Sequence, residues 1–230
     1  MQKVWIFGDS YSSAEHHANF QWPVRLASKY NVRNWSWGGT GPEYMINIFR
    51  QELESKNVIV DELKDINLIF FISRDSRKDF SFITNPSDQC CMNRIGNWDK
   101  RLNKKYRKHK SFIDNFYRHY YIHNNLCDFN HLKYVGIIKE FSRFFKKVLV
   151  VSVFDRPEES LLLTKFNTRL ENTENFTYAK GPALFFVEKE VNGDEPNHLC
   201  LENHNIMYNE LSNWIEHDIP FDTKKLKKIS

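Results

Sequence analysis

Apolar residues along this chain form short unbroken runs, and longer segments with helical spacing separate them. Because both faces of such runs are apolar, each predicts a buried strand. The runs are Lys3–Phe7, Ile66–Ile72, Lys147–Phe154 and Ala183–Val187, and Val32–Trp37, which mixes apolar and polar residues, is a candidate for the second strand. Apolar residues at helical spacing predict helices over Phe20–Tyr30, Glu43–Leu53, Ser111–Lys146 (with a break near Asn124-Asn125) and Leu201–Ile215.

Strands that alternate with helices long enough to cross over are typical of a parallel sheet covered on both faces. We therefore expect an α/β fold, a three-layer α/β/α sandwich with a mostly parallel central sheet. At 230 residues, the chain fits a single domain, residues 1–219. Residues 80–110 are polar and basic without a clear period, so we expect a long loop within a basic insertion around 80–125. Residues 220–230 form a basic tail that we expect to fray.

Composition indicates a globular protein, with 41% hydrophobic and 27% charged residues. No apolar run approaches the ~18 residues of a membrane-spanning helix. The apolar stretch Val4–Phe7 is too short for a secretory signal. Four cysteines show neither a disulfide framework nor the spacing of a metal site, and Cys90-Cys91 are interpreted as thiols. We expect a cytoplasmic protein that does not contact a membrane.

Most of the net charge of +4 is local: the stretch Lys100–Lys110 holds seven basic side chains and no acid, and the tail from Lys224 to Lys228 adds four lysines. Aromatic residues follow the first stretch at positions 112, 116, 117, 120 and 121. Basic residues beside aromatics can bind single-stranded nucleic acid by charge and stacking. The i, i+4 spacing of Phe112, Phe116 and Tyr120 on one helix favours core packing instead. Nucleic-acid binding therefore stays the weaker alternative, and the charges face solvent or an acidic polymer such as a decorated polysaccharide.

The first cluster with chemical potential is Gly8-Asp9-Ser10, directly after the first strand. A serine hydroxyl needs an adjacent base to act as a nucleophile, and it must sit on an exposed turn, which a glycine permits. Asp9 is expected to hydrogen-bond the backbone of that turn. Taken alone, the same residues also describe an ordinary turn at the end of a strand.

The second cluster, Asp194-Glu195-Pro-Asn-His198, lies just ahead of the last helix. A histidine near a carboxylate suits a general base whose ring the carboxylate orients, and either Asp194 or Glu195 can fill that role. The alternative is a loop histidine beside a helix cap. His16, His17 and His204 show no metal-site spacing and are interpreted as surface or pocket-rim residues.

Together these clusters resemble the SGNH/GDSL hydrolase superfamily, which has a GDS loop after its first strand and a DxxH-type motif before its last helix. Trp22-Pro23-Val24-Arg25-Leu26 is similar to the segment that follows the nucleophile loop, and Asn34 to Thr40 is similar to the second block. His198 to His204 follows the final segment, with Asn203 where a glycine is usual. The resemblance spans Lys3 to about Leu211.

This resemblance implies a flavodoxin-like sheet and a serine esterase that works through an acyl-enzyme without a cofactor or a metal. Ser10 would be the nucleophile and His198 its base, with Asp194 or Glu195 as the third member of a triad. The backbone N–H groups of Ser10 and Gly39 would form the oxyanion hole. A small acyl group, such as acetyl on a carbohydrate or polysaccharide, is the substrate that the family favours.

One block departs from the family pattern. The third block usually reads Gly-x-Asn-Asp, and its asparagine donates to the oxyanion, whereas here Ser73-Arg74-Asp75-Ser76-Arg77 follows the third strand. Ser73 or an arginine such as Arg74 can replace that donor, and losing one such donor costs about 100- to 1000-fold in rate. Alternatively, these residues form a surface ion-pair cluster. A catalytically degenerate carbohydrate-binding protein and an acyltransferase therefore remain alternatives to a hydrolase.

Overall fold

The computed structural model describes ten segments of the chain, and all structural statements below concern them. They are residues 1–14, 19–55, 58–72, 78–80, 83–85, 104–121, 126–153, 172–179, 188–191 and 195–226. Within these ranges, every helix is too short or too polar to span a bilayer.

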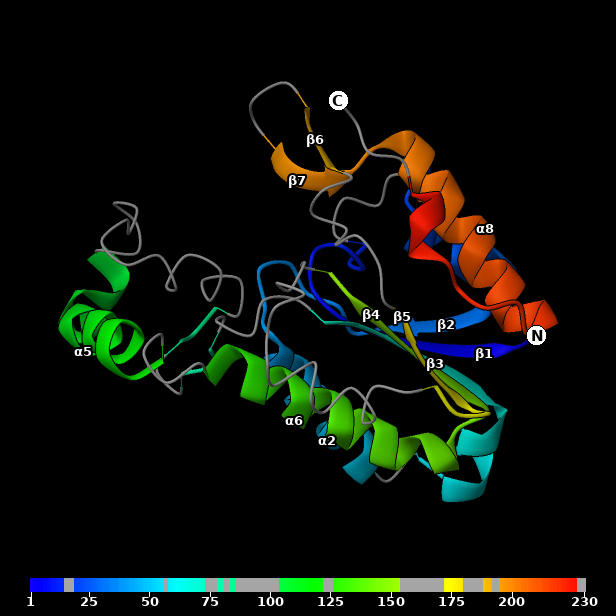
Figure 1. Ribbon diagram of the computed structural model, residues 1–230, viewed down its shortest axis with the longest axis horizontal. Helices are drawn as coiled ribbons and strands as arrows, with labels where there is room; N and C mark the ends of the chain where they lie inside the picture. Colours follow the sequence, from blue (N-terminus) through cyan, green and yellow to red (C-terminus); the bar gives the residue numbers. More distant parts are fainter. Residues whose placement is uncertain are drawn as a thin grey trace.

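A five-stranded parallel sheet forms the centre of the molecule, with strand order β2-β1-β3-β4-β5 (Figure 1). The strands are β1 (Lys3–Phe7), β2 (Asn31–Asn34), β3 (Ile66–Ile72), β4 (Lys147–Ser152) and β5 (Phe176–Ala179). This is the flavodoxin-like order of doubly wound folds. All seven residues of β3 are buried, which explains its unbroken apolar sequence.

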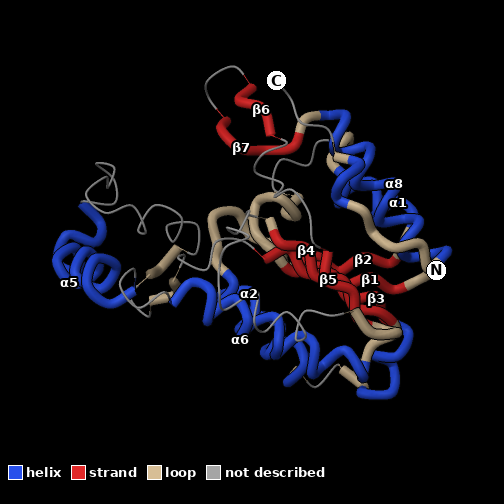
Figure 2. Tube along the Cα trace, viewed as in Figure 1, coloured by secondary structure: helices blue, strands red, loops and turns tan. Residues whose placement is uncertain are grey.

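Helices cover both faces of this sheet (Figure 2). One face carries α1 (Trp22–Lys29) and α8 (Leu201–His217), and the other carries α2 (Pro42–Glu54) and α6 (Leu126–Phe141). Successive residues of β1 enter opposite cores, since Val4 and Ile6 pack with α1 and α8 whereas Trp5 and Phe7 pack with α2 and α6. The predicted α/β/α sandwich is therefore confirmed.

Most of the predicted elements lie where the sequence places them, but the strands after residue 172 differ from expectation. β5 was not predicted, and the run Ala183–Val187, predicted as the last strand, lies outside the described residues. The segment before the last helix, for which no strand was predicted, forms β7 (Glu195–Leu199), which pairs antiparallel with β6 (Glu188–Val191). Pairing with a second strand gives these polar residues an extended backbone, so the alternative of a histidine in a loop does not describe His198.

A helical arm replaces part of the long loop expected over residues 80–110. Residues 104–106 are helical, followed by η3 (Arg107–His109), α5 (Lys110–Asn115) and the π-helical η4 (Phe116–Tyr121). The Phe80 ring contacts the rings of Phe112, Phe116 and Tyr117 at centroid distances of 5.9, 5.4 and 6.3 Å. These aromatic contacts supply the packing that holds the arm, as its helical spacing suggested.

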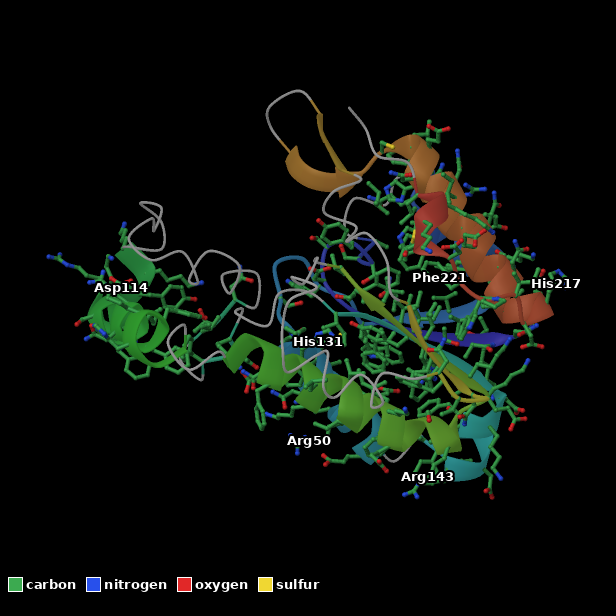
Figure 3. The ribbon with its side chains drawn as sticks, viewed as in Figure 1. Arg50, Asp114, His131, Arg143, His217 and Phe221 are labelled. Atoms are coloured by element: carbon green, nitrogen blue, oxygen red, sulfur yellow. The ribbon has the colours of Figure 1, made fainter. Side chains whose placement is uncertain are left out.

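The chain after Pro220 is packed rather than frayed. Phe221 and Leu226 belong to the core on the α1/α8 face, and Phe221 lies beside α8 (Figure 3). Between them, the short helix η8 (Thr223–Lys225) places Lys225 Nζ 2.8 Å from Glu210 Oε1. The expectation of a frayed tail is wrong as far as Leu226, because its two apolar side chains reach the core.

Candidate active site

The turn after β1 presents Ser10 at the carboxyl edge of the sheet. The Asp9 carbonyl oxygen accepts hydrogen bonds from the N–H groups of Ser12 at 3.1 Å and Ser13 at 2.9 Å, which closes the turn. Asp9 Oδ1 also accepts the Tyr11 N–H at 3.1 Å, so the expected role of Asp9 is confirmed. Asp9 is buried, whereas Ser10 at the top of the turn is partly exposed. A nucleophile needs this combination of a fixed backbone and an accessible hydroxyl.

Gly8 is required by the close approach of the turn to β3. A Cβ at this position would lie 2.2 Å from Ser12 Oγ and 2.8 Å from Phe71 Cβ. The serine hydroxyl can rotate away, but Phe71 belongs to a strand that is hydrogen-bonded to β1. Glycine therefore lets the backbone of the turn pass this close to β3.

The segment after β2 is hydrogen-bonded to this turn. The Trp37 N–H donates to the Gly8 carbonyl oxygen at 3.1 Å, and Asn34 Nδ2 donates to the Ser12 carbonyl oxygen at 2.7 Å. Asn34 Oδ1 accepts the Ser36 N–H at 2.9 Å, so one side chain joins both segments. The predicted second block thus lies beside the Ser10 turn.

These adjoining segments carry two backbone N–H groups of interest, those of Ser10 and Gly39. Gly39 has φ of 78°, a left-handed conformation that favours glycine. Within the described part of the chain, no hydrogen bond uses the N–H group of Ser10 or of Gly39. An oxyanion hole requires such donors, fixed in advance and not paired with the protein itself.

Trp22 and His204 join the Ser10 turn to the start of α8. Trp22 Nε1 donates to the Tyr11 carbonyl oxygen at 3.0 Å, and the Trp22 backbone N–H donates to His204 Nδ1 at 3.3 Å. Trp22 is fully buried and His204 nearly so. An accepting Nδ1 places the ring proton of neutral His204 on Nε2. His204 was expected at a surface or a pocket rim and is instead a buried structural contact.

The backbone of His198 lies opposite Lys189 of β6, two residues before Cys200, the N-cap of α8. The next residue, Leu199, is buried in the same core cluster as Tyr11. The pairing is irregular at this point, because the four residues of β7 from Glu195 to His198 lie opposite the three residues of β6 from Lys189 to Val191.

Several predicted site residues are not among the described parts of the structure. These are Ser73, Arg74, Asp194, the side chains of Glu195 and His198, and also His16 and His17. The triad and the third oxyanion donor therefore remain predictions, as does the choice between Asp194 and Glu195. Among the predicted site residues that the structure describes, Ser10 and Gly39 lie on segments that are hydrogen-bonded to each other.

Lys78 and Asp79, which follow the third block, contact Glu43 in the first turn of α2. Glu43 Oε2 accepts the Asp79 backbone N–H at 3.3 Å and lies 4.0 Å from Lys78 Nζ. Burial raises the pKa of Asp79, and a hydrogen bond from Asn47 lowers it, while the charge of Glu43 raises it again. Sequence reasoning missed this cluster, because no motif marks it.

Two other features of the molecule bear on the site. Among the described residues, no group of three or more histidines, cysteines and carboxylates is placed to hold a metal ion. A cavity of about 90 Å³ lies at the opposite end of the sheet, lined by residues at the amino ends of strands, including Lys3, Asn31 and Ile66. In parallel sheets, ligands bind at the carboxyl ends, which is the edge that carries Ser10.

Comparison with known proteins finds similarity among solved structures. No family model and no curated protein matches the chain. Among solved structures, the chain is similar to the psychrotrophic esterase EstA from Pseudoalteromonas sp., inhibited by monoethylphosphonate. The two share 11% sequence identity with a TM-score of 0.47, over 94% of this chain and 97% of that chain. Similarity at this level of sequence identity does not identify active-site residues in this chain.

Proposed function

We propose that this protein is a serine esterase of the SGNH/GDSL type, which removes a small acyl group such as acetyl from a carbohydrate. One observation carries the proposal. The Ser10 turn and the Gly39 segment are hydrogen-bonded together at the carboxyl edge of the sheet, and both residues have an N–H group that donates to no described residue. Backbone donors fixed beside a partly exposed serine are what an oxyanion hole requires.

In the proposed reaction, Ser10 Oγ attacks the carbonyl carbon of the ester while His198 accepts the hydroxyl proton. The carbonyl oxygen becomes an oxyanion, which the N–H groups of Ser10 and Gly39 stabilise. The C–O bond to the alcohol then breaks, and His198 returns its proton to the departing alcohol oxygen. A water molecule hydrolyses the acyl-enzyme by the same steps, which releases the acid and restores Ser10.

Two roles in this scheme fall to residues chosen by sequence alone. Asp194 or Glu195 would hold the His198 ring in the required tautomer and stabilise its protonated form. Ser73 or Arg74 would supply the third oxyanion donor in place of the asparagine of the family. The hydrogen bond from the Asp79 N–H to Glu43 supports the role of Ser73 or Arg74. It fixes the position of the backbone two residues after the third block.

The experiment that tests this function measures hydrolysis of p-nitrophenyl acetate and octanoate, and acetate release from acetylated oligosaccharides. We expect the acetyl ester to be preferred and Ser10→Ala to abolish both activities. Ser28→Ala is the matched control, because Ser28 is an exposed serine of α1 whose Oγ donates only to its own helix, at the Arg25 carbonyl oxygen. Activity that survives Ser10→Ala would contradict the proposal.

The missing third-block asparagine favours one other function, a protein that binds acetylated carbohydrate without turnover. In that case, the folded protein would bind acetylated oligosaccharides but release no acetate from them. An acyltransferase would instead pass the acyl group to an added alcohol faster than to water. Measuring acetate release with and without an alcohol acceptor separates the three.

A further inference from the structure

Four basic side chains of the helical arm gather on one surface. Lys104, Lys105, Arg107 and Lys108 are all exposed and line an open depression of about 550 Å³. No acidic residue occurs between Lys100 and Lys110, so the depression is uniformly positive along the chain. We call these four residues the basic surface.

Three of the four side chains of the basic surface carry charges that no acidic residue of the described arm pairs with. Within the described part of the chain, Lys104, Arg107 and Lys108 belong to no ion pair. Asp114, the acidic residue of the arm, is instead paired with Lys110 at 2.8 Å. Lys104 and Lys108 are also four residues apart, a spacing at which like charges on a helix repel each other. A bound anion would remove this repulsion.

The basic surface is built on a packed base. Tyr106, Ile113 and Tyr117 are buried, and the Tyr106 hydroxyl oxygen accepts the Thr84 N–H at 3.3 Å. Together with the Phe80 ring, these contacts fix the helix that carries the charges. The four side chains therefore share one anchored backbone, which reduces the entropy lost when they bind a ligand together.

The arm lies where a bound polymer would reach the candidate active site. Figure 1 shows the arm, labelled α5, projecting on the side of the sheet where the parallel strands end. The chain connects it to that edge through Phe80, directly after the contact of Asp79 with Glu43. A polymer bound along the arm would lie on the same side of the molecule as Ser10.

We propose that the basic surface binds a linear acidic polysaccharide, whose carboxylates it pairs with. Two observations favour this partner over nucleic acid. Single-strand binding relies on exposed aromatic rings, yet Tyr106 and Tyr117 are buried and only Phe112 of the arm's described aromatic rings is largely exposed. Three of the four basic residues are also lysines, which act as point charges without the bidentate geometry of arginine at phosphates. The choice of polymer rests on the proposed function, since this polymer would carry the ester.

The test measures binding of the full-length protein to a fluorescent oligogalacturonide by anisotropy, as the salt concentration is raised. A neutral dextran oligomer of matched length and a single-stranded oligonucleotide of matched charge are the comparison probes. We expect the oligogalacturonide to bind most tightly, with an affinity that falls as salt increases. The double variant Lys104→Gln/Lys108→Gln should weaken binding by about 10- to 30-fold.

Lys64→Gln/Lys133→Gln is the matched control, because it removes two exposed lysines from η1 (Val60–Asp65) and α6, away from the arm. We expect it to bind as the unmodified protein does. Equal affinity of the two double variants, no binding of oligogalacturonide, or tighter binding of the oligonucleotide would each overturn the inference. Hydrolysis of p-nitrophenyl acetate, assayed in parallel, should be the same in both variants. Salt-sensitive binding without any hydrolysis would support the basic surface and contradict the esterase.

Discussion

Replacing Asn34 with alanine separates the positioning of the Ser10 turn from general stability. The substitution removes two hydrogen bonds, from Asn34 Nδ2 to the Ser12 carbonyl oxygen at 2.7 Å and from the Ser36 N–H to Asn34 Oδ1 at 2.9 Å. Each bond contributes about 1 kcal/mol, so the free energy of unfolding should fall by about 2 kcal/mol. For a chain of this length, that corresponds to a fall in Tm of about 4–8 °C.

The effect on chemistry should be larger than the effect on stability. Without Asn34, the Ser10 turn and the Gly39 segment lose a direct connection, and small displacements of catalytic groups reduce rates by up to about 100-fold. We expect fluorophosphonate labelling of Ser10 to slow by about 10- to 100-fold at a temperature where the variant is folded. Asn175→Ala is the matched control, because Asn175 Nδ2 also donates to a backbone carbonyl oxygen, that of Ser142 at 2.8 Å, before β5.

The assay compares Tm and labelling rate in both variants. Asn175→Ala should lower Tm to a similar degree and leave the labelling rate unchanged. The reasoning is refuted if Asn34→Ala lowers Tm and labels as fast as the unmodified protein. It is also refuted if both variants slow labelling equally, since the loss would then reflect stability alone.

Four further predictions concern single residues. Gly39→Ala should reduce esterase activity by about 100-fold, because a residue with φ of 78° must shift to relieve strain and would move its N–H donor; kcat with p-nitrophenyl acetate measures this. Gly8→Ala should lower the free energy of unfolding by about 1–3 kcal/mol in urea, because its Cβ would meet backbone-linked atoms of β3. Phe221→Ala should lower it by about 3 kcal/mol, whereas a frayed tail would give no change. Burial raises the pKa of Asp79 above its usual 3.8, so folding binds a proton and the contribution of Asp79 to stability falls as pH rises through that range. The Tm of Asp79→Asn should therefore rise relative to the Tm of the unmodified protein as pH is raised from about 4. A difference in Tm that stays the same at every pH would contradict the raised pKa.

The strands that the sequence predicted well are those buried on both faces. Ile66–Ile72 has the predicted bounds, because every residue in it is apolar and no local alternative competes. β5 was missed because it has four residues, of which Thr177 is polar, too few for a pattern to emerge. β7 was missed because Glu195, Pro196 and Asn197 have low strand propensity, and only pairing with β6 makes them extended.

The candidate site likewise contains residues that the sequence predicted and contacts that it could not predict. Ser10 was predicted because a glycine turn directly after a buried strand leaves a local signal in the sequence, and Gly39 was predicted from the resemblance of its segment to a known family. The contacts of Asn34 and His204 left none, since each depends on a partner that folding brings near, 22 residues away for Asn34 with Ser12 and 182 for His204 with Trp22. Tertiary hydrogen bonds of this kind can be located only once the elements are packed.

The most direct test of the central claim is fluorophosphonate labelling of the purified protein, read by intact mass and by mapping of the modified peptide. An activated serine in an oxyanion hole reacts with this probe, whereas an ordinary turn serine does not. The account predicts one adduct on Ser10, which is lost in Ser10→Ala and in His198→Ala while both variants remain folded. A folded protein that forms no adduct, or that is labelled equally in His198→Ala, would contradict it.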